Sequence, residues 1–137
     1  MKRRLVDALA LCLLAGCLWR GYAAIMQVHL DVLTQTAHKL CTVMASGRGV
    51  SAEAMAEYVY PAQRAREFLR QFSNQGSRRS YGQFTTLVER YESMVHDVDT
   101  ARAAGREATQ VTAQLPAQCA ALDQLAAAVR AQLARDE

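Results

Sequence analysis

The feature that most constrains the fold of this chain is a spacing of three and four residues between apolar side chains. This spacing places the side chains on one face of an α-helix. It first appears in residues 22–45, in the series Met26, Leu30, Leu33, Ala37, Leu40 and Met44. No segment shows the strict alternation that a half-buried strand requires. The chain has only two prolines and seven glycines, so it tolerates long helices, and we predict an all-α fold.

Breaks between the apolar series define the predicted helices. The two glycines within residues 46–49 predict a turn. Ser51 then suits the N-cap of a second helix, since a serine oxygen accepts from a backbone N–H of the first turn. Its apolar series is Met55, Tyr58, Ala62, Ala65, Leu69 and Phe72. Pro61 lies inside this series, and we expect it to kink the helix or split it near Tyr60.

Two further helices complete the predicted architecture. Residues 73–77 form a polar turn, and a third helix should run over residues 78–113 with a bend near Gly105. Its apolar series is Phe84, Leu87, Tyr91, Met94, Val98 and Ala101. Pro116 should end that helix and begin the last one, with Cys119 in its first turn. Four helices with short turns predict an antiparallel four-helix bundle, and an elongated helical hairpin is the alternative.

The N-terminus has the features of an export signal. Residues 2–4 are Lys-Arg-Arg, residues 8–15 are all apolar, and Gly16 and Cys17 follow. A basic start, a short apolar stretch and small residues at its end are typical of secretory signals. The apolar run ends at Trp19, so it is well short of the roughly 20 residues that a spanning helix needs.

The segment Leu14-Ala15-Gly16-Cys17 resembles the lipobox of bacterial lipoproteins. This resemblance covers residues 1–17 and implies a signal peptide over residues 1–16. Cys17 would become the lipidated N-terminal residue, followed by a tether over residues 17–21 and a helical domain over residues 22–137. The resemblance also implies a location in the cell envelope facing the periplasm, and Leu18 in place of an aspartate slightly favours the outer membrane. The alternative is an uncleaved anchor in which Cys17 is an ordinary apolar residue.

Cysteine usage agrees with export. Cys12 would be removed with the signal peptide and Cys17 would be acylated, so Cys41 and Cys119 would be the remaining pair. An even pair in an oxidising compartment predicts a disulfide. Such a bond closes a loop of about 80 residues and contributes about 4 kcal/mol by the chain-entropy estimate. The alternative is that both are buried thiols.

The remaining candidates for binding are few. Arg64, Arg66, Arg70, Arg78 and Arg79 form a local basic run that is a possible interaction patch for lipid headgroups, cell-wall polymers or an acidic partner. The alternative is an ordinary solvated helix face. Without the N-terminal Lys2, Arg3 and Arg4, the chain is nearly neutral, which argues against nucleic-acid binding.

Sites for metals, cofactors or catalysis are not predicted. His38 and Cys41 are three residues apart on one helix face, but zinc requires three or four ligands, so we expect His38 to pack beside a disulfide. The methionines fall at core spacing, which favours packing over copper binding. No catalytic motif occurs, and we expect a non-enzymatic protein.

These patterns together predict a membrane-tethered envelope lipoprotein that acts as a structural or protein-interaction module. Its partners would be the membrane, through the lipid anchor, and another envelope protein. Two alternatives stay open. The first is a helical bundle that senses or binds a small ligand between its helices. The second is a subunit of a membrane complex that keeps its N-terminal anchor.

Overall fold

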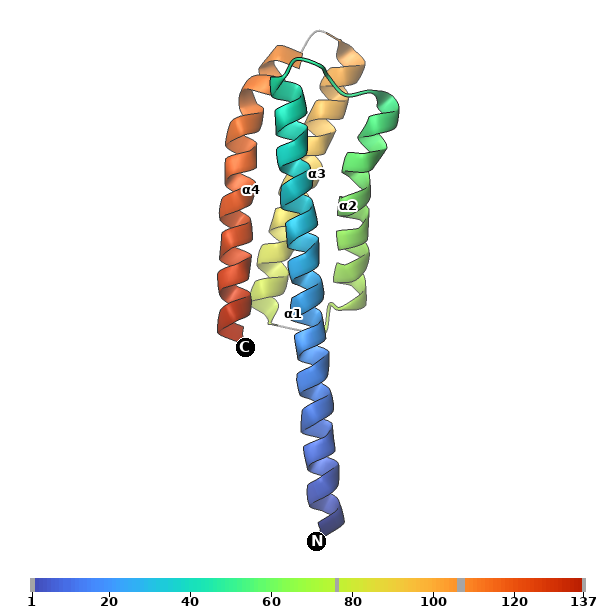
Figure 1. Cartoon of the computed structure of the whole chain (residues 1–137), viewed down its shortest axis with the longest axis vertical. Helices are drawn as coiled ribbons and strands as arrows, with labels where there is room; N and C mark the ends of the chain where they lie inside the picture. The colour runs from blue at the N-terminus through green and yellow to red at the C-terminus, as the bar shows by residue number, and fades with distance from the viewer. Residues whose placement is uncertain (1, 76, 106–107, 137) are drawn as a thin grey trace.

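The protein folds into four α-helices and no strand over the residues that its computed structural model describes. These are residues 2–75, 77–105 and 108–136, with side chains from residue 21 onward except at residue 108. The helices are α1 (Lys2–Ala45), α2 (Ala52–Gln71), α3 (Arg78–Ala104) and α4 (Ala108–Asp136), as Figure 1 shows. The predicted all-α fold is therefore confirmed.

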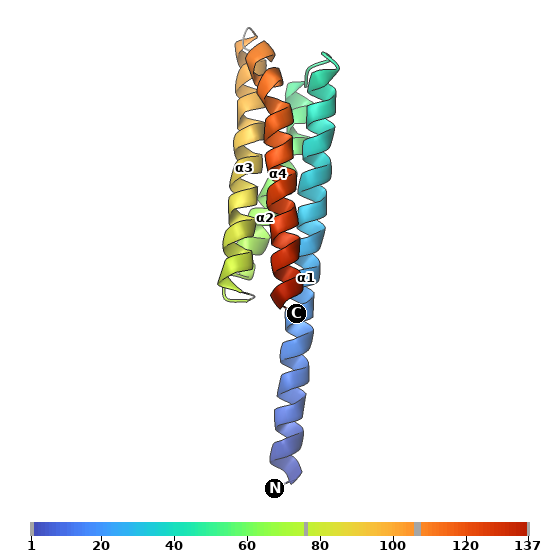
Figure 2. The ribbon, with the colours of Figure 1, turned by 90° about the vertical axis from the view of Figure 1, so that its left-hand side faces the viewer.

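The helices run up, down, up and down, and they form an antiparallel bundle (Figure 1). Each of α1 and α3 contacts both α2 and α4, and α1 also touches α3 across the centre. The N-terminal part of α1 extends beyond the ends of the other three helices in both views (Figures 1 and 2). Because α1 has 44 residues, it is about 66 Å long, far longer than its neighbours.

The core is built from the apolar series seen in the sequence. All six residues of the 22–45 series are at most 8% exposed, and Tyr22 joins them at 1%. The third series is also fully buried, together with Val88 and Val95. In the second series only Phe72 is half-buried, because it forms the C-cap of α2. Burial follows the sequence period because each helix turns one stripe toward the same central axis.

Serine caps mark where α2 and α3 begin. The Ser51 side chain accepts from the Ala54 N–H at the start of α2 (3.1 Å), which confirms the predicted cap. Ser77 does the same for α3, where its side chain accepts from the Ser80 N–H (3.0 Å). Each cap satisfies a backbone donor that the first turn would otherwise leave without a partner.

The predicted boundary between the third and fourth helices is wrong. The third helix ends at Ala104, not at residue 113, because Gly105 adopts a left-handed conformation (φ 69°) that terminates it. The last helix already begins at Ala108 and runs through Pro116, so Cys119 lies well inside α4. Pro116 is exposed, so its ring does not disturb the packed face of the helix.

Pro61 does not split α2, which is continuous from Ala52 to Gln71. The first turns of α2 are inclined to the rest of the helix in Figure 1, as a proline kink would produce. Pro61 is itself buried, so its ring packs against the bundle.

Among the described residues, none of the helices combines the length and apolarity needed to cross a membrane.

Candidate functional site

The basic run separates into two groups in the folded chain. Arg64 donates to Glu67 within α2 (2.8 Å). Arg66 forms a two-pronged ion pair with Glu92 of α3, with N–O distances of 3.0 and 2.6 Å. The hydrogen bond to Glu92 raises the pKa of the Arg66 guanidinium. The guanidinium groups of these two arginines are therefore already paired with carboxylates of the same chain.

The other three arginines, Arg70, Arg78 and Arg79, flank the turn between α2 and α3, and all three are exposed. Within the part of the chain whose side chains are described, no carboxylate forms an ion pair with any of them. We call these three residues the basic end. In Figure 1 the α2–α3 turn lies at the end of the bundle from which α1 leaves.

A polar hollow of about 290 Å³ opens beside this turn. Its lining consists of hydroxyl, amide and guanidinium groups, with one aromatic ring, and comprises Ser73, Asn74, Gln75, Ser77, Arg78 and Tyr81. Hydroxyls, amides and guanidinium groups all donate hydrogen bonds, so the lining suits an anionic or strongly polar group.

Asp136 closes the bundle at the same end. Its carboxylate accepts from the Ser77 hydroxyl (2.6 Å) and from the Gln132 amide (2.7 Å). Burial raises the pKa of Asp136, but the hydrogen bonds from Ser77, Gln132 and Ser80 outweigh it and hold the pKa below its usual value. The last turn of α4 is thereby bound to the first turn of α3.

Aromatic rings fill the interior just above this polar end. The Tyr22 ring of α1 lies 5.4 Å from that of Phe68 and 6.1 Å from that of Phe72, measured between centroids. Burial raises the pKa of Tyr22 to about 12, so its hydroxyl stays neutral at physiological pH. Tyr22 therefore marks the level along α1 at which the end of α2 lies.

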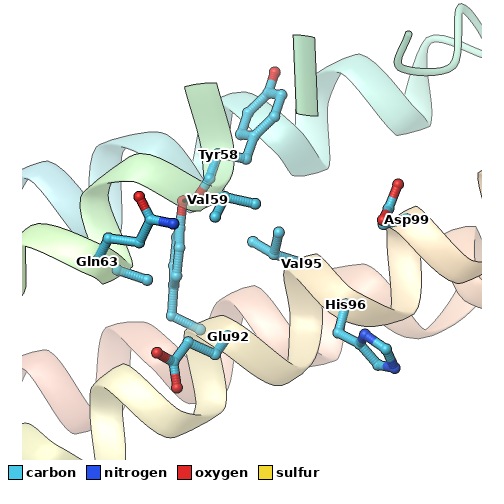
Figure 3. A pocket seen from close by; sticks show the side chains of 9 residues that line it. Tyr58, Val59, Gln63, Glu92, Val95, His96 and Asp99 are labelled. Carbon is cyan, nitrogen blue, oxygen red and sulfur yellow. Dashed lines mark hydrogen bonds between the residues drawn. The ribbon is translucent and has the colours of Figure 1, made fainter. Parts of the chain in front are cut away.

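A second hollow, of about 220 Å³, lies in the groove between α2 and α3 (Figure 3). Val59 and Val95 point toward each other across it, whereas the His96 ring points away from α2 (Figure 3). Glu92 on its edge is already paired with Arg66. The groove thus has an apolar floor, and both carboxylates on its edge, Glu92 and Asp99, are paired with arginines, which suits an apolar side chain better than a reacting substrate.

The groove lies against a buried tyrosine that sequence reasoning assigned only to the core. The Tyr91 hydroxyl donates to the Tyr58 carbonyl oxygen (2.6 Å), one turn before Pro61 in α2. Pro61 has no N–H to donate to the carbonyl of Glu57, four residues earlier, so the Tyr91 hydroxyl binds a neighbouring carbonyl in the same disturbed turn. Burial raises the pKa of Tyr91, with Tyr58 adding to the effect, so its hydroxyl remains a donor.

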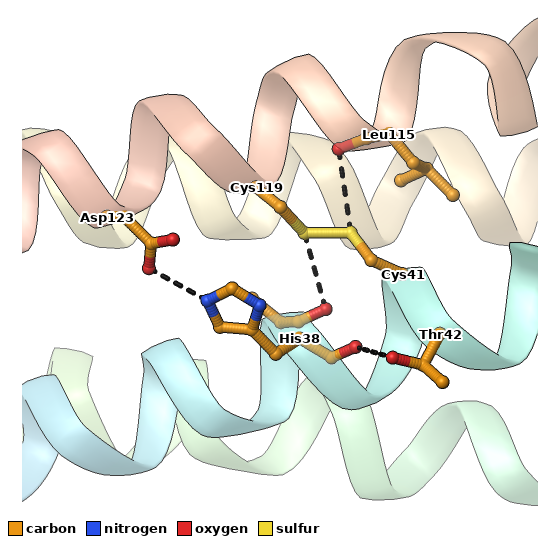
Figure 4. The surroundings of a disulfide bond; sticks show 7 residues. His38, Cys41, Thr42, Leu115, Cys119 and Asp123 are labelled. Atoms are coloured by element: carbon orange, nitrogen blue, oxygen red, sulfur yellow. Dashed lines mark hydrogen bonds and ion pairs between the residues drawn. A yellow bond between two sulfur atoms is a disulfide. The ribbon is translucent and has the colours of Figure 1, made fainter.

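A disulfide joins Cys41 of α1 to Cys119 of α4 (Figure 4). The sulfur of Cys41 lies 3.5 Å from the Leu115 carbonyl oxygen. His38 lies close to the bond, but its side chain is 57% exposed and contacts the Asp123 carboxylate at 2.9 Å. His38 therefore lies beside the disulfide as expected, but its ring is not packed there, because it reaches across to α4 at the surface.

No protein-family model, curated protein or solved structure matches this chain. The candidate sites therefore rest on the residues and geometry alone. Among the described residues, no group of three or more His, Cys, Asp and Glu side chains is arranged to hold a metal ion. The Cys17 side chain lies outside the described residues, although the backbone there is part of α1.

An apolar stripe is exposed on α1, and sequence reasoning missed it. Ile25, Val28 and Val32 are 40%, 60% and 42% exposed. They are spaced by three and four residues, so they lie on one face of the helix. The same period produces the buried series of α1, so two apolar stripes lie on this helix. The second stripe was visible in the spacing, but only the packed bundle shows that it stays exposed.

Proposed function

We propose that this protein is a bacterial envelope lipoprotein whose lipidated Cys17 holds a four-helix bundle at a membrane surface. The bundle serves there as a structural or protein-interaction module for another envelope protein. Its periplasmic location, slightly favouring the outer membrane, is part of this proposal. Lipid chains anchor such a protein through burial of their methylene groups, each contributing about 0.8 kcal/mol.

The observation that carries the proposal is the division of α1 at about Tyr22. From Tyr22 onward α1 contributes buried side chains to the core. Before it, α1 lies beyond the ends of the other helices (Figures 1 and 2). Loss of residues 1–16 would therefore leave the core intact, as removal of a signal peptide requires. The remaining residues 17–21 would form the short tether.

Two further features support an exported interaction module. The disulfide between Cys41 and Cys119 is typical of oxidising compartments outside the cytoplasm. The exposed stripe of Ile25, Val28 and Val32 offers a continuous apolar face, of the kind that marks contact sites in proteins.

The proposal is tested by the intact mass of the full chain expressed in a bacterial host and purified from membranes. We expect a mass equal to residues 17–137 plus acyl chains, with a gain of two hydrogens on reduction. Cys17→Ala should lack the acyl mass and should not be cleaved before residue 17.

Cys12→Ala is the matched control, because Cys12 belongs to the segment that would be removed. It should give the same mature mass as the unaltered chain. A full-length mass without acyl chains, unchanged by Cys17→Ala, would contradict lipidation.

The second candidate is a membrane-complex subunit with an uncleaved N-terminal anchor. Its support is the uninterrupted course of α1 from Lys2 to Ala45, which has no break at the predicted cleavage point. This candidate predicts that membrane attachment survives Cys17→Ala.

The small-ligand alternative has less support. The core is filled by apolar side chains from all four helices, and the two hollows described above have exposed residues in their walls.

A further inference from the structure

The basic end stands on the side of the bundle that would face the membrane. Figure 1 shows the α2–α3 turn at the end from which the N-terminal part of α1 emerges. Tyr22 is level with this end through its contacts with Phe68 and Phe72. Cys17 precedes Tyr22 by five residues of helix, which is about 7.5 Å along the axis. A bilayer that holds Cys17 therefore lies within about one Debye length of these arginines.

The charges of the described side chains at this end do not balance. Arg70, Arg78 and Arg79 are exposed, and no described carboxylate pairs with them. Arg135 adds a fourth exposed guanidinium, which donates to the Gln132 side chain (3.0 Å). Among the described residues, Asp136 is the acid nearest to this end, and its oxygens already accept from Ser77 and Gln132. The described side chains at this end thus leave an excess of positive charge.

The hollow beside the arginines has the chemistry of a phosphate site. Arg78 is one of its walls, and serine hydroxyls with asparagine and glutamine amides form much of the rest. Tyr81 adds an aromatic ring with a polar tip, a side chain that is enriched at membrane–water interfaces. Arginines pair with phosphate through charge-assisted hydrogen bonds, and the Ser73 hydroxyl and the neighbouring amides supply additional donors, whereas the Ser77 hydroxyl already donates to Asp136.

We propose that the basic end binds the headgroups of anionic phospholipids, so that the bundle stands upright on the membrane. This inference rests on the proposed tethering of the N-terminus. It assigns the arginines to lipid in preference to an acidic protein, because the tether turns this end toward the bilayer and leaves the sides of the bundle for proteins. A short tether and a second point of attachment together fix the orientation of the bundle.

Hydrogen exchange of the full-length chain in nanodiscs tests this inference. One set of nanodiscs contains phosphatidylcholine alone, and the other contains phosphatidylcholine mixed with phosphatidylglycerol. We expect backbone amides of residues 77–81 to exchange more slowly in the anionic nanodiscs, by about tenfold or more, since each surface arginine favours the anionic leaflet. Residues 46–50, at the opposite end, should exchange equally in both.

The variant R70Q/R78Q/R79Q should lose the difference between the two lipids. The matched control R48Q/R90Q/R102Q removes the same charge from exposed arginines away from this end, and it should keep the difference. Equal exchange of residues 77–81 in both nanodiscs would overturn the inference, and so would an equal effect of the two triple variants. A chain that attaches to neither nanodisc would instead contradict the membrane tether itself.

Discussion

At the scale of single residues, one buried side chain, Tyr91, and one half-buried side chain, His29, connect helices in ways that the sequence does not predict. Tyr91 of α3 donates to the backbone of α2 just before Pro61. His29 of α1 packs against Phe68 of α2, with 5.1 Å between the ring centroids. Both contacts join residues of different helices through a side chain, so their contribution to stability is measurable by substitution.

Tyr91→Phe should lower the free energy of unfolding by about 1–2 kcal/mol, because the Tyr58 carbonyl loses a buried hydrogen bond. Chemical denaturation monitored by circular dichroism measures this loss. Tyr60→Phe is the control, since Tyr60 is 60% exposed and should change stability by less than about 0.5 kcal/mol. Equal effects of the two variants would show that the Tyr91 hydrogen bond contributes nothing.

The imidazole of His29 should make stability depend on pH. Burial lowers the pKa of His29, and the charge of Arg64 lowers it further. Because the unfolded chain binds this proton more tightly than the folded chain, the free energy of unfolding has its full value above about pH 6.5 and decreases as the pH falls below it. The unfolding temperature, measured between about pH 5 and pH 8, should therefore decrease as the pH falls below about 6.5, and this decrease is the expected slope.

His29→Gln should flatten that slope, whereas His96→Gln should retain it, because His96 is exposed on α3. A pH profile that is unchanged by His29→Gln would contradict the assignment.

At the scale of helices, the ends are held by polar side chains while the faces are held by apolar packing. Ser77 has two roles, since it caps α3 and donates to Asp136 at the end of α4. Ser51 only caps α2. The two serines therefore separate the effect of a cap from the effect of a link between helices.

Ser77→Ala should destabilise the protein by about 1–2 kcal/mol, and Ser51→Ala by about 1 kcal/mol. The difference arises because Ser77→Ala also releases Asp136 from one of its hydrogen bonds. Urea denaturation of both variants measures it. Asp136→Asn in the Ser77→Ala background should then add less than it does alone, and full additivity would argue against a direct link.

At the scale of the whole molecule, a single covalent bond joins the two helices that hold the chain ends. The disulfide connects α1 and α4 across a sequence separation of 78 residues. Long loops lose the most entropy when they are closed, so this bond restrains the unfolded chain strongly. The apolar core contains residues of all four helices and does not depend on the bond alone.

The double variant Cys41→Ala/Cys119→Ala should lose about 2–4 kcal/mol of stability and keep its helical content. Thermal unfolding by circular dichroism, with and without reductant, measures both quantities. Reductant should lower the unfolding temperature of the unaltered chain and have no effect on the double variant. An unaltered chain that is insensitive to reductant would indicate that the bond does not form in solution.

The four helices and most of the core were predictable from the sequence. Apolar spacing is a local property, and it identifies the buried stripe of each helix whenever one stripe dominates, as in the series from Phe84 to Ala101. Ser51 was recognisable as a cap for the same reason, since its partner is three residues away. The resemblance of Leu14-Ala15-Gly16-Cys17 to a lipobox is likewise a local pattern, and the proposed lipidation of Cys17 starts from it.

Tertiary structure decided what depends on neighbours that are distant in sequence. Two prolines are visible in the sequence, but packing keeps α2 and α4 continuous through both, and Gly105 ends α3 instead. The five arginines look alike in the sequence. In the structure Arg66 pairs with Glu92 of α3, whereas the three arginines of the basic end are exposed. The period of a helix states which residues share a face, whereas only the folded bundle determines what each face meets.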